Sequence, residues 1–126
     1  MIQLFINQKE IQESIPFEDA IAFGGWMIDT HPPEGVDAID EKPANQIELD
    51  HIYDIPLRSC VAEFPDNLMF AGRNISATHI AFASTRVMAT CFAVGQGVGT
   101  AAAYLSEKQI PANKIINDPK GIKTIQ

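Results

Sequence analysis

The chain has 126 residues, a length that suits one domain or a part of a larger protein. Hydrophobic residues make up 46% and charged residues 20%, so a packed core can form and wholesale disorder is excluded. The formal net charge of −7, with nine scattered basic residues, argues against a nucleic-acid ligand and against an anionic membrane surface.

Targeting segments and metal-binding patterns are also missing from the sequence. No stretch approaches the roughly 20 consecutive apolar residues of a membrane span, and residues 1–4 lack the basic start of a signal peptide. The two cysteines, Cys60 and Cys91, lack metal-ligand spacing and are too few for a disulfide scaffold. We therefore expect a soluble, cytoplasmic protein without a metal site.

The first 45 residues predict short strands followed by a long loop. Residues 1–23 alternate apolar runs with Gln, Asn and Glu, which predicts one or two strands with a turn near residues 7–9. Gly24-Gly25 predicts a sharp turn or a close approach of the backbone to another group. Residues 26–45 are rich in proline and acidic residues and predict a loop, and loops of that length are usually functional or lie on a partner.

Strand-like sequence returns in the middle of the chain. Residues 47–62 predict a strand that Pro56 interrupts, since an interior strand does not tolerate proline. Residues 68–71 form a short apolar run that ends at Gly72, as is typical of a strand buried on both faces of a parallel sheet. Residues 73–83 predict a polar connection.

A long helix is predicted to begin at Ser84 and to end before Pro111. Apolar residues spaced by three or four positions predict one buried face, made of Val87, Cys91, Val94, Val98, Ala101 and Leu105. Three glycines, at 95, 97 and 99, weaken this helix by roughly 1 kcal/mol each relative to alanine. Close approach to a sheet or to a flat ligand would compensate. Residues 112–126 predict a loop with a last short helical turn.

The order of strand, Gly72, connection and glycine-rich helix is suggestive of a ligand site. In doubly wound folds, ligands bind beyond the carboxyl ends of strands and near helix N-termini. An ordinary packed strand–helix pair without a ligand is the alternative interpretation of this spacing.

Several stretches carry a more specific signal, and they are Gly24–Gly35, Tyr53–Arg58, Asn67–His79, Ser84–Cys91 and Gly95–Ala102. In this order they resemble the C-terminal part of a family of FAD-dependent oxidoreductases that is often bacterial and sometimes labelled xanthan-lyase-like. The resemblance spans roughly residues 17–126. It implies an α+β fragment, with strands of a substrate-binding domain in residues 1–63. Residues 64–126 would then be the last strand and long C-terminal helix of a Rossmann-type FAD domain.

The resemblance also implies site residues. In such proteins the long helix points its N-terminus at the flavin, which implicates as FAD-binding residues Gly72, Arg73, Ser84, Thr85, Arg86 and Gln96. His79 and Arg86 are the catalytic candidates, His79 as an acid or base and Arg86 as a partner of a substrate carboxylate or of reduced flavin. Substrate-binding candidates are Trp26, Asp29, His31 and Arg58. A purely structural role is the alternative for each.

One departure from the family pattern limits these expectations. The strand–Gly-x-Gly-x-x-Gly–helix unit that cradles the FAD pyrophosphate has no counterpart in the sequence, because the glycines at 95, 97 and 99 follow no strand. We therefore expect weak or absent FAD binding and no activity for this chain alone, with a missing Rossmann half or a partner subunit completing the enzyme. A subunit of a split flavoenzyme and a small non-catalytic binding module are the alternatives. Uncovered strand edges would favour a homo-oligomer.

Overall fold

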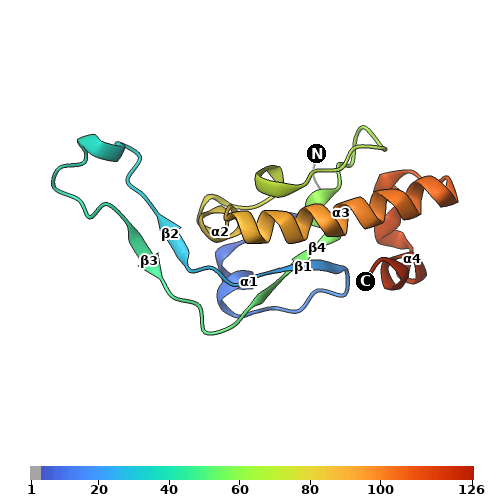
Figure 1. Cartoon of the computed structure of the whole chain (residues 1–126), viewed down its shortest axis with the longest axis horizontal. Coiled ribbons are helices and arrows are strands. Elements are labelled where there is room, and N and C mark those ends of the chain that lie inside the picture. Colours follow the sequence, from blue (N-terminus) through green and yellow to red (C-terminus); the bar gives the residue numbers. More distant parts are fainter. Residues whose placement is uncertain (1–3) are drawn as a thin grey trace.

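The computed structural model describes residues 4–126, which form a small α+β protein with two short antiparallel sheets (Figure 1). In these residues the helices are α1 (Gln8–Gln12), α2 (His79–Thr85), α3 (Met88–Lys108) and α4 (Pro119–Ile125). The strands are β1 (Ala20–Gly24), β2 (Ile28–Thr30), β3 (Asn45–Ile47) and β4 (Tyr53–Pro56). The α+β class expected from the sequence is therefore confirmed. Ile2, part of the first expected strand, lies outside the described residues.

The N-terminal segment differs from the strands and turn expected there, because residues 8–12 form helix α1. The Asn7 side chain accepts from the Glu10 N–H at 3.2 Å, and the Glu10 carboxylate accepts from the Asn7 N–H at 2.8 Å. This reciprocal capping box satisfies two N–H groups at the helix start and favours helix over strand. Among residues 4–23, Ile6 makes a single parallel bridge with Ala77, and a strand forms only where β1 begins.

Strand β1 pairs with β4 in antiparallel register, with Gly24 opposite Tyr53 and Ala20 opposite Pro56. The Tyr53 ring occupies the space that a side chain at position 24 would need. The predicted close approach at Gly24 is thus confirmed, and glycine is required there. Pro56 ends β4, as its missing N–H predicts.

Strands β2 and β3 form a ribbon that extends away from the body of the protein (Figure 1). Ile28 pairs with Ile47 and Thr30 with Asn45, so part of the expected loop over residues 26–45 is strand. Three residues per strand are too few for an alternating pattern to be visible in the sequence. At the far end, Val36 is 97% exposed.

The long helix begins four residues later than expected. Ser84 lies inside the preceding helix α2, and Val87 has extended backbone angles and precedes α3. Helix α2 is started by Thr78, whose hydroxyl accepts from the Ala81 N–H at 3.4 Å, so the polar connection expected over residues 73–83 is partly helical. The apolar spacing runs through both helices and conceals the break between them.

Helix α3 packs against β1 and against α4. Of its predicted buried face, four residues are buried and two, Val87 and Cys91, are partly exposed; the buried ones are Val94, Val98, Ala101 and Leu105. Gly97 faces β1 so closely that an added Cβ would lie 2.6 Å from the Ile21 carbonyl oxygen. The expected close approach to a sheet is therefore confirmed at Gly97. At Gly95 and Gly99 an added Cβ would meet nothing within 4 Å.

Residues 68–71 do not form the expected strand of a parallel sheet. Met69 makes a single antiparallel bridge with Val61, and the Phe70 N–H donates to the Cys60 carbonyl at 2.7 Å. Among the described residues, no parallel strand lies beside residues 68–71, so this run forms one bridge in place of a strand. It is followed by a 3-10 turn at Gly72–Asn74 that contacts α3.

Residues from both sides of the expected boundary at 63/64 share one hydrophobic core, which includes Ile55 and Leu57 as well as Val94 and Ala101. The division into two domains is not tested by this packing and stays a prediction. Among residues 4–126, no helix is long and apolar enough to cross a membrane.

Candidate functional site

Arg86 and Asp29 lie together where α2 ends beside β2. Strand β2 packs against α2, and Asp29 of that strand lies next to Arg86, the residue that follows the last residue of α2. Arg86 Nη2 donates to the Asp29 carbonyl at 3.1 Å and lies 3.7 Å from Asp29 Oδ2. The side chains are 34% and 16% exposed, so the ion pair is partly screened by solvent. Two candidates that are 57 positions apart in the sequence thus form one cluster.

His31 extends this cluster. Its Nε2 lies 3.4 Å from Asp29 Oδ2, and its Nδ1 lies 2.8 Å from the Pro43 carbonyl oxygen. Both ring nitrogens therefore face oxygen acceptors. Asp29 is the central member, since its Oδ2 faces both the Arg86 guanidinium and the His31 ring, while its buried Oδ1 has no hydrogen-bond partner among the described residues. A buried carboxylate oxygen without a donor is costly and marks a position where a further donor would be stabilising.

Trp26 is joined to the same region through the backbone. It is 48% exposed, and its carbonyl accepts a hydrogen bond from the hydroxyl of Ser84, which is fully buried. The Ser84 oxygen also lies 2.7 Å from the Tyr53 hydroxyl. Burial raises the pKa of Tyr53 to about 12, and its hydrogen bond to Ser84 opposes that shift. Ser84 is thus occupied by two protein partners.

The N-terminus of α3 follows directly after Arg86. Val87, the residue before the helix, provides no side-chain cap, and the first turn has no acidic residue. A helix of 21 residues with uncapped N–H groups presents partial positive charge at this end. Thr85, two residues before the cap, has a buried hydroxyl with no hydrogen-bond partner among residues 4–126.

Gly72 and Arg73 lie in the 3-10 turn that contacts α3. Gly72 has φ of +76°, a conformation that favours glycine. Arg73 is an exposed residue of that turn. The turn therefore lies against α3, and the ligand site that the sequence order suggested there stays a prediction.

Arg58 is placed elsewhere, since β4 carries the chain away from Trp26 toward the Ala20 end of the β1–β4 sheet. Its guanidinium pairs with the fully buried carboxylate of Asp19, with Nη2 to Oδ1 at 2.6 Å and Nε to Oδ2 at 3.0 Å. The backbone N–H of Arg58 also donates to Asp19 Oδ2, at 2.9 Å. The hydrogen bond with Asp19 is the main cause of a raised pKa at Arg58. Arg58 therefore stabilises a buried charge in this structure.

Gln96 is also apart from the cluster, because it lies eight positions into α3, about 12 Å along the helix. It lines a hollow of about 510 Å³ between β1 and α3, together with Phe23 and Thr100. His79 is the first residue of α2 and is exposed. Neither residue lies with Arg86 and Asp29.

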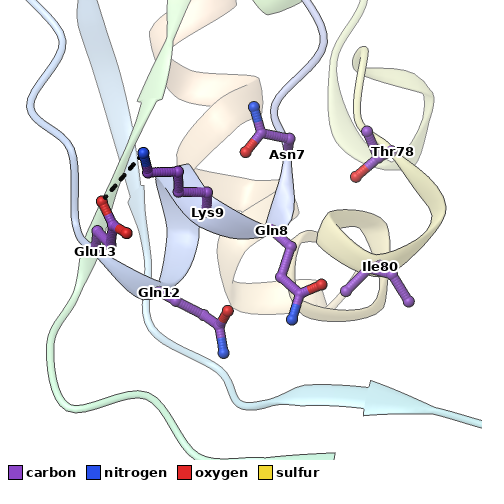
Figure 2. Close-up of a pocket in the computed structure, with 7 residues that line it drawn as sticks. All are labelled: Asn7, Gln8, Lys9, Gln12, Glu13, Thr78 and Ile80. Atoms are coloured by element: carbon purple, nitrogen blue, oxygen red, sulfur yellow. Dashed lines mark ion pairs between the residues drawn. The ribbon is translucent and has the colours of Figure 1, made fainter.

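A shallow hollow of about 400 Å³ lies between α1 and the start of α2 (Figure 2). Gln8, Thr78 and Ile80 line it, while Lys9 and Glu13 form an ion pair on the side away from α2. None of the candidate site residues lines this hollow. We do not place the site there.

Sequence reasoning missed two residues that hold candidate residues in place: Tyr53, which bonds to Ser84 near the cluster, and Asp19, which pairs with Arg58 apart from it. Tyr53 falls in a stretch that resembles the family, but its place opposite Gly24 follows from the pairing of β1 with β4 and has no signal in the sequence. Asp19 has no sequence signal of its own. Within the described part of the chain, no group of three His, Cys, Asp or Glu residues could hold a metal ion.

The family model described as "FAD dependent oxidoreductase" matches residues 3–126. Neither a curated protein nor a solved structure matches the chain. The match covers nearly the whole sequence, so the chain belongs to the FAD-dependent oxidoreductase family.

Proposed function

From this membership we propose that the chain is the flavin-facing, C-terminal part of an FAD-dependent oxidoreductase of the bacterial, xanthan-lyase-like kind. The observation that carries the proposal is the uncapped N-terminus of α3 beside Arg86, in a chain that matches the family over residues 3–126. FAD, when bound, supplies the acceptor for a hydride taken from an organic substrate.

The residues at this end of α3 fit such a group. Reduction places negative charge on the pyrimidine end of a flavin, and uncapped helix N–H groups with a nearby guanidinium stabilise negative charge. The first turn of α3 contains no carboxylate that would oppose this. Gly72, Arg73 and Thr85 would flank the flavin from the turn and from the end of α2, and Gln96 would lie further along the helix. Asp29 partly neutralises Arg86, which limits the size of the effect.

The substrate side would be formed by Trp26, Asp29 and His31. Asp29 and His31 provide acceptor and donor groups on β2 and just after it, and the half-exposed Trp26 offers an aromatic face. Aromatic rings with an exposed face and nearby polar groups are suited to orienting a polar organic molecule. His79 would act as an acid or base only if the remaining part of the enzyme brings it to the substrate. Arg58, which pairs with Asp19, is the least suited of the candidates to contact a substrate.

A Rossmann-type unit with the strand–Gly-x-Gly-x-x-Gly–helix motif would hold the pyrophosphate, either in the same polypeptide or in a partner subunit. Residues 1–63 would belong to the substrate-binding domain and residues 64–126 to the FAD domain. The support for this is chemical, since the FAD pyrophosphate needs a row of backbone N–H groups that one helix N-terminus does not supply. The chain alone would then bind FAD weakly and would not turn over.

The test is a reconstitution followed by a measurement of flavin redox potential. The chain alone should show no saturable change in FAD fluorescence. Mixed or joined with the Gly-x-Gly-x-x-Gly unit of the same enzyme, it should form a flavin complex. In that complex Arg86→Gln should lower the two-electron reduction potential by about 20 mV, since about 1 kcal/mol of charge stabilisation is lost.

The matched control is Lys108→Gln, which removes a positive charge from the other end of the same helix, about 30 Å away. It should leave the potential unchanged. Equal potentials for the wild-type and Arg86→Gln complexes would refute the placement of the flavin at α3.

A non-catalytic interaction module is the second candidate, and the β2–β3 ribbon favours it. Val36 is 97% and Ile39 is 89% exposed in the segment that joins β2 to β3, where they are available to a partner. A homo-oligomer would be one form of such an interaction. Sedimentation of the chain, compared with a Val36→Ser and Ile39→Ser variant, tests this, since a monomer in both cases would contradict self-association through the ribbon.

A further inference from the structure

Ser84 lies at a point where three segments of the chain meet. Its side chain is fully buried, and its hydroxyl contacts the Tyr53 hydroxyl of β4 and the Trp26 carbonyl of the loop after β1. Ser84 itself belongs to the last turn of α2, two residues before Arg86.

The direction of these hydrogen bonds follows from the chemistry of the groups. A carbonyl oxygen only accepts, so Ser84 donates its single proton to Trp26. The hydrogen bond at 2.7 Å between the two hydroxyls must then be donated by Tyr53. Tyr53 is held in place by its ring, which packs over Gly24 where no side chain fits. The chain of donors therefore runs from Tyr53 through Ser84 to Trp26.

A second connection runs parallel to the first. Arg86 donates to the Asp29 carbonyl at 3.1 Å, so residues 84–86 hold residues 26–29 at both ends. Both acceptors are backbone carbonyls, which fixes the path of the loop rather than one side-chain rotamer. The end of α2 and the Trp26 loop must consequently move together.

We infer that Ser84 is a positioning residue, which holds the Trp26 loop against the junction of α2 and α3 through a hydroxyl oriented by Tyr53. The purpose of this positioning rests on the proposed function, in which Ser84 acts on the site through Trp26 and does not contact the flavin. The three-group chain thereby sets the position of Trp26 relative to Arg86 before any ligand binds.

The test uses the fluorescence of Trp26, which is the single tryptophan of the chain. Ser84→Ala removes the donor to the Trp26 carbonyl and should raise the acrylamide quenching constant of the folded protein. The rise should reach at most about twofold, because Trp26 is already 48% exposed and released loops expose their side chains. Far-UV circular dichroism on the same samples establishes that the variants are folded.

The matched control is Ser76→Ala, since Ser76 is also a buried serine but its hydroxyl has no partner among the described residues. Its quenching constant should equal that of the wild type. Ser84→Cys keeps a weak donor in the same place, so its quenching constant should lie between those of the wild type and Ser84→Ala. It replaces Ser84→Ala in the test if the alanine variant does not fold.

Wild-type quenching in the folded Ser84 variants would overturn the inference, as would an equal rise in Ser76→Ala. The measurement contains no flavin, so its outcome is independent of the reconstitution that tests the proposed function. If Ser84→Ala raised the quenching constant while Arg86→Gln left the flavin reduction potential unchanged, the positioning role of Ser84 would stand and only the flavin site would be refuted.

Discussion

The three glycines of α3 give a sharp test of how this helix is packed. Each glycine costs a helix about 1 kcal/mol relative to alanine, so replacement with alanine is stabilising wherever the new methyl group has room. Gly95 and Gly99 have that room, since an added Cβ meets nothing within 4 Å. We therefore expect Gly95→Ala and Gly99→Ala each to raise the free energy of unfolding by up to about 1 kcal/mol.

Gly97→Ala should have the opposite sign. Its Cβ would lie 2.6 Å from the backbone oxygen of Ile21 and 2.9 Å from the Ile21 Cβ. A backbone atom cannot move aside as the end of a flexible side chain can, so helix and strand must separate. Overpacking of this kind costs about 1–3 kcal/mol, which exceeds the gain in helix propensity and leaves a net loss of about 1 kcal/mol.

Urea unfolding followed by far-UV circular dichroism measures these differences, and the gap between Gly97→Ala and Gly95→Ala should be about 2 kcal/mol. Unchanged m-values would show that the variants unfold from equally compact states. If Gly97→Ala proved as stable as Gly95→Ala, the close packing of α3 on β1 would be refuted.

Three further predictions concern polar side chains, namely the buried Tyr53, the Arg58–Asp19 pair and the helix cap Asp118. Burial raises the pKa of Tyr53 to about 12, so the folded state holds this proton more tightly than the unfolded state. The associated stability, about 3 kcal/mol, should be complete below pH ~10 and lost as the pH rises toward about 12, and Tyr53→Phe should remove this part of the pH dependence of urea unfolding. Arg58→Ala should lower the free energy of unfolding by about 2–3 kcal/mol, which is less than for a fully buried pair because the Arg58 side chain is 36% exposed. Adding Asp19→Asn to this variant should restore part of the loss. Full stability of Arg58→Ala alone would show that the pair is dispensable. Asp118→Ala should cost about 1–2 kcal/mol in thermal unfolding, because Asp118 caps α4 and accepts from the Tyr104 hydroxyl at 3.2 Å, whereas an unchanged melting temperature would contradict this cap.

Local patterns in the sequence predicted those features that local chemistry decides. The close approach at Gly24, the end of a strand at Pro56 and the buried side of α3 each depend on a single residue type or on helical spacing. The capping box of Asn7 and Glu10 was of the same local kind, and it would have predicted α1 in place of a turn.

The start of α3 could not be found in this way. Apolar spacing continues from α2 through Val87 into α3, and only the extended backbone of Val87 separates the two helices. Strand β2 packs against the helix before this break, α2, which is a contact between segments far apart in the sequence. The same contact joins Arg86 to Asp29, which explains why the two candidates were identified separately and their pairing was not.

The way the candidate site is held together bears on what this chain can contribute to a flavoenzyme. Residues 84–86 and 26–29 are joined by two hydrogen bonds, and Asp29 already faces both Arg86 and His31. Groups fixed before a ligand arrives lose little conformational entropy when it binds, so under the proposed function they would orient substrate and flavin at small cost. Orientation is distinct from affinity, however, because Arg86 is partly neutralised and one helix N-terminus contributes on the order of 1 kcal/mol. Under the proposed function, strong binding of FAD would therefore come from the unit that holds the pyrophosphate, and substitutions around Arg86 should change the redox potential of the flavin far more than its dissociation constant.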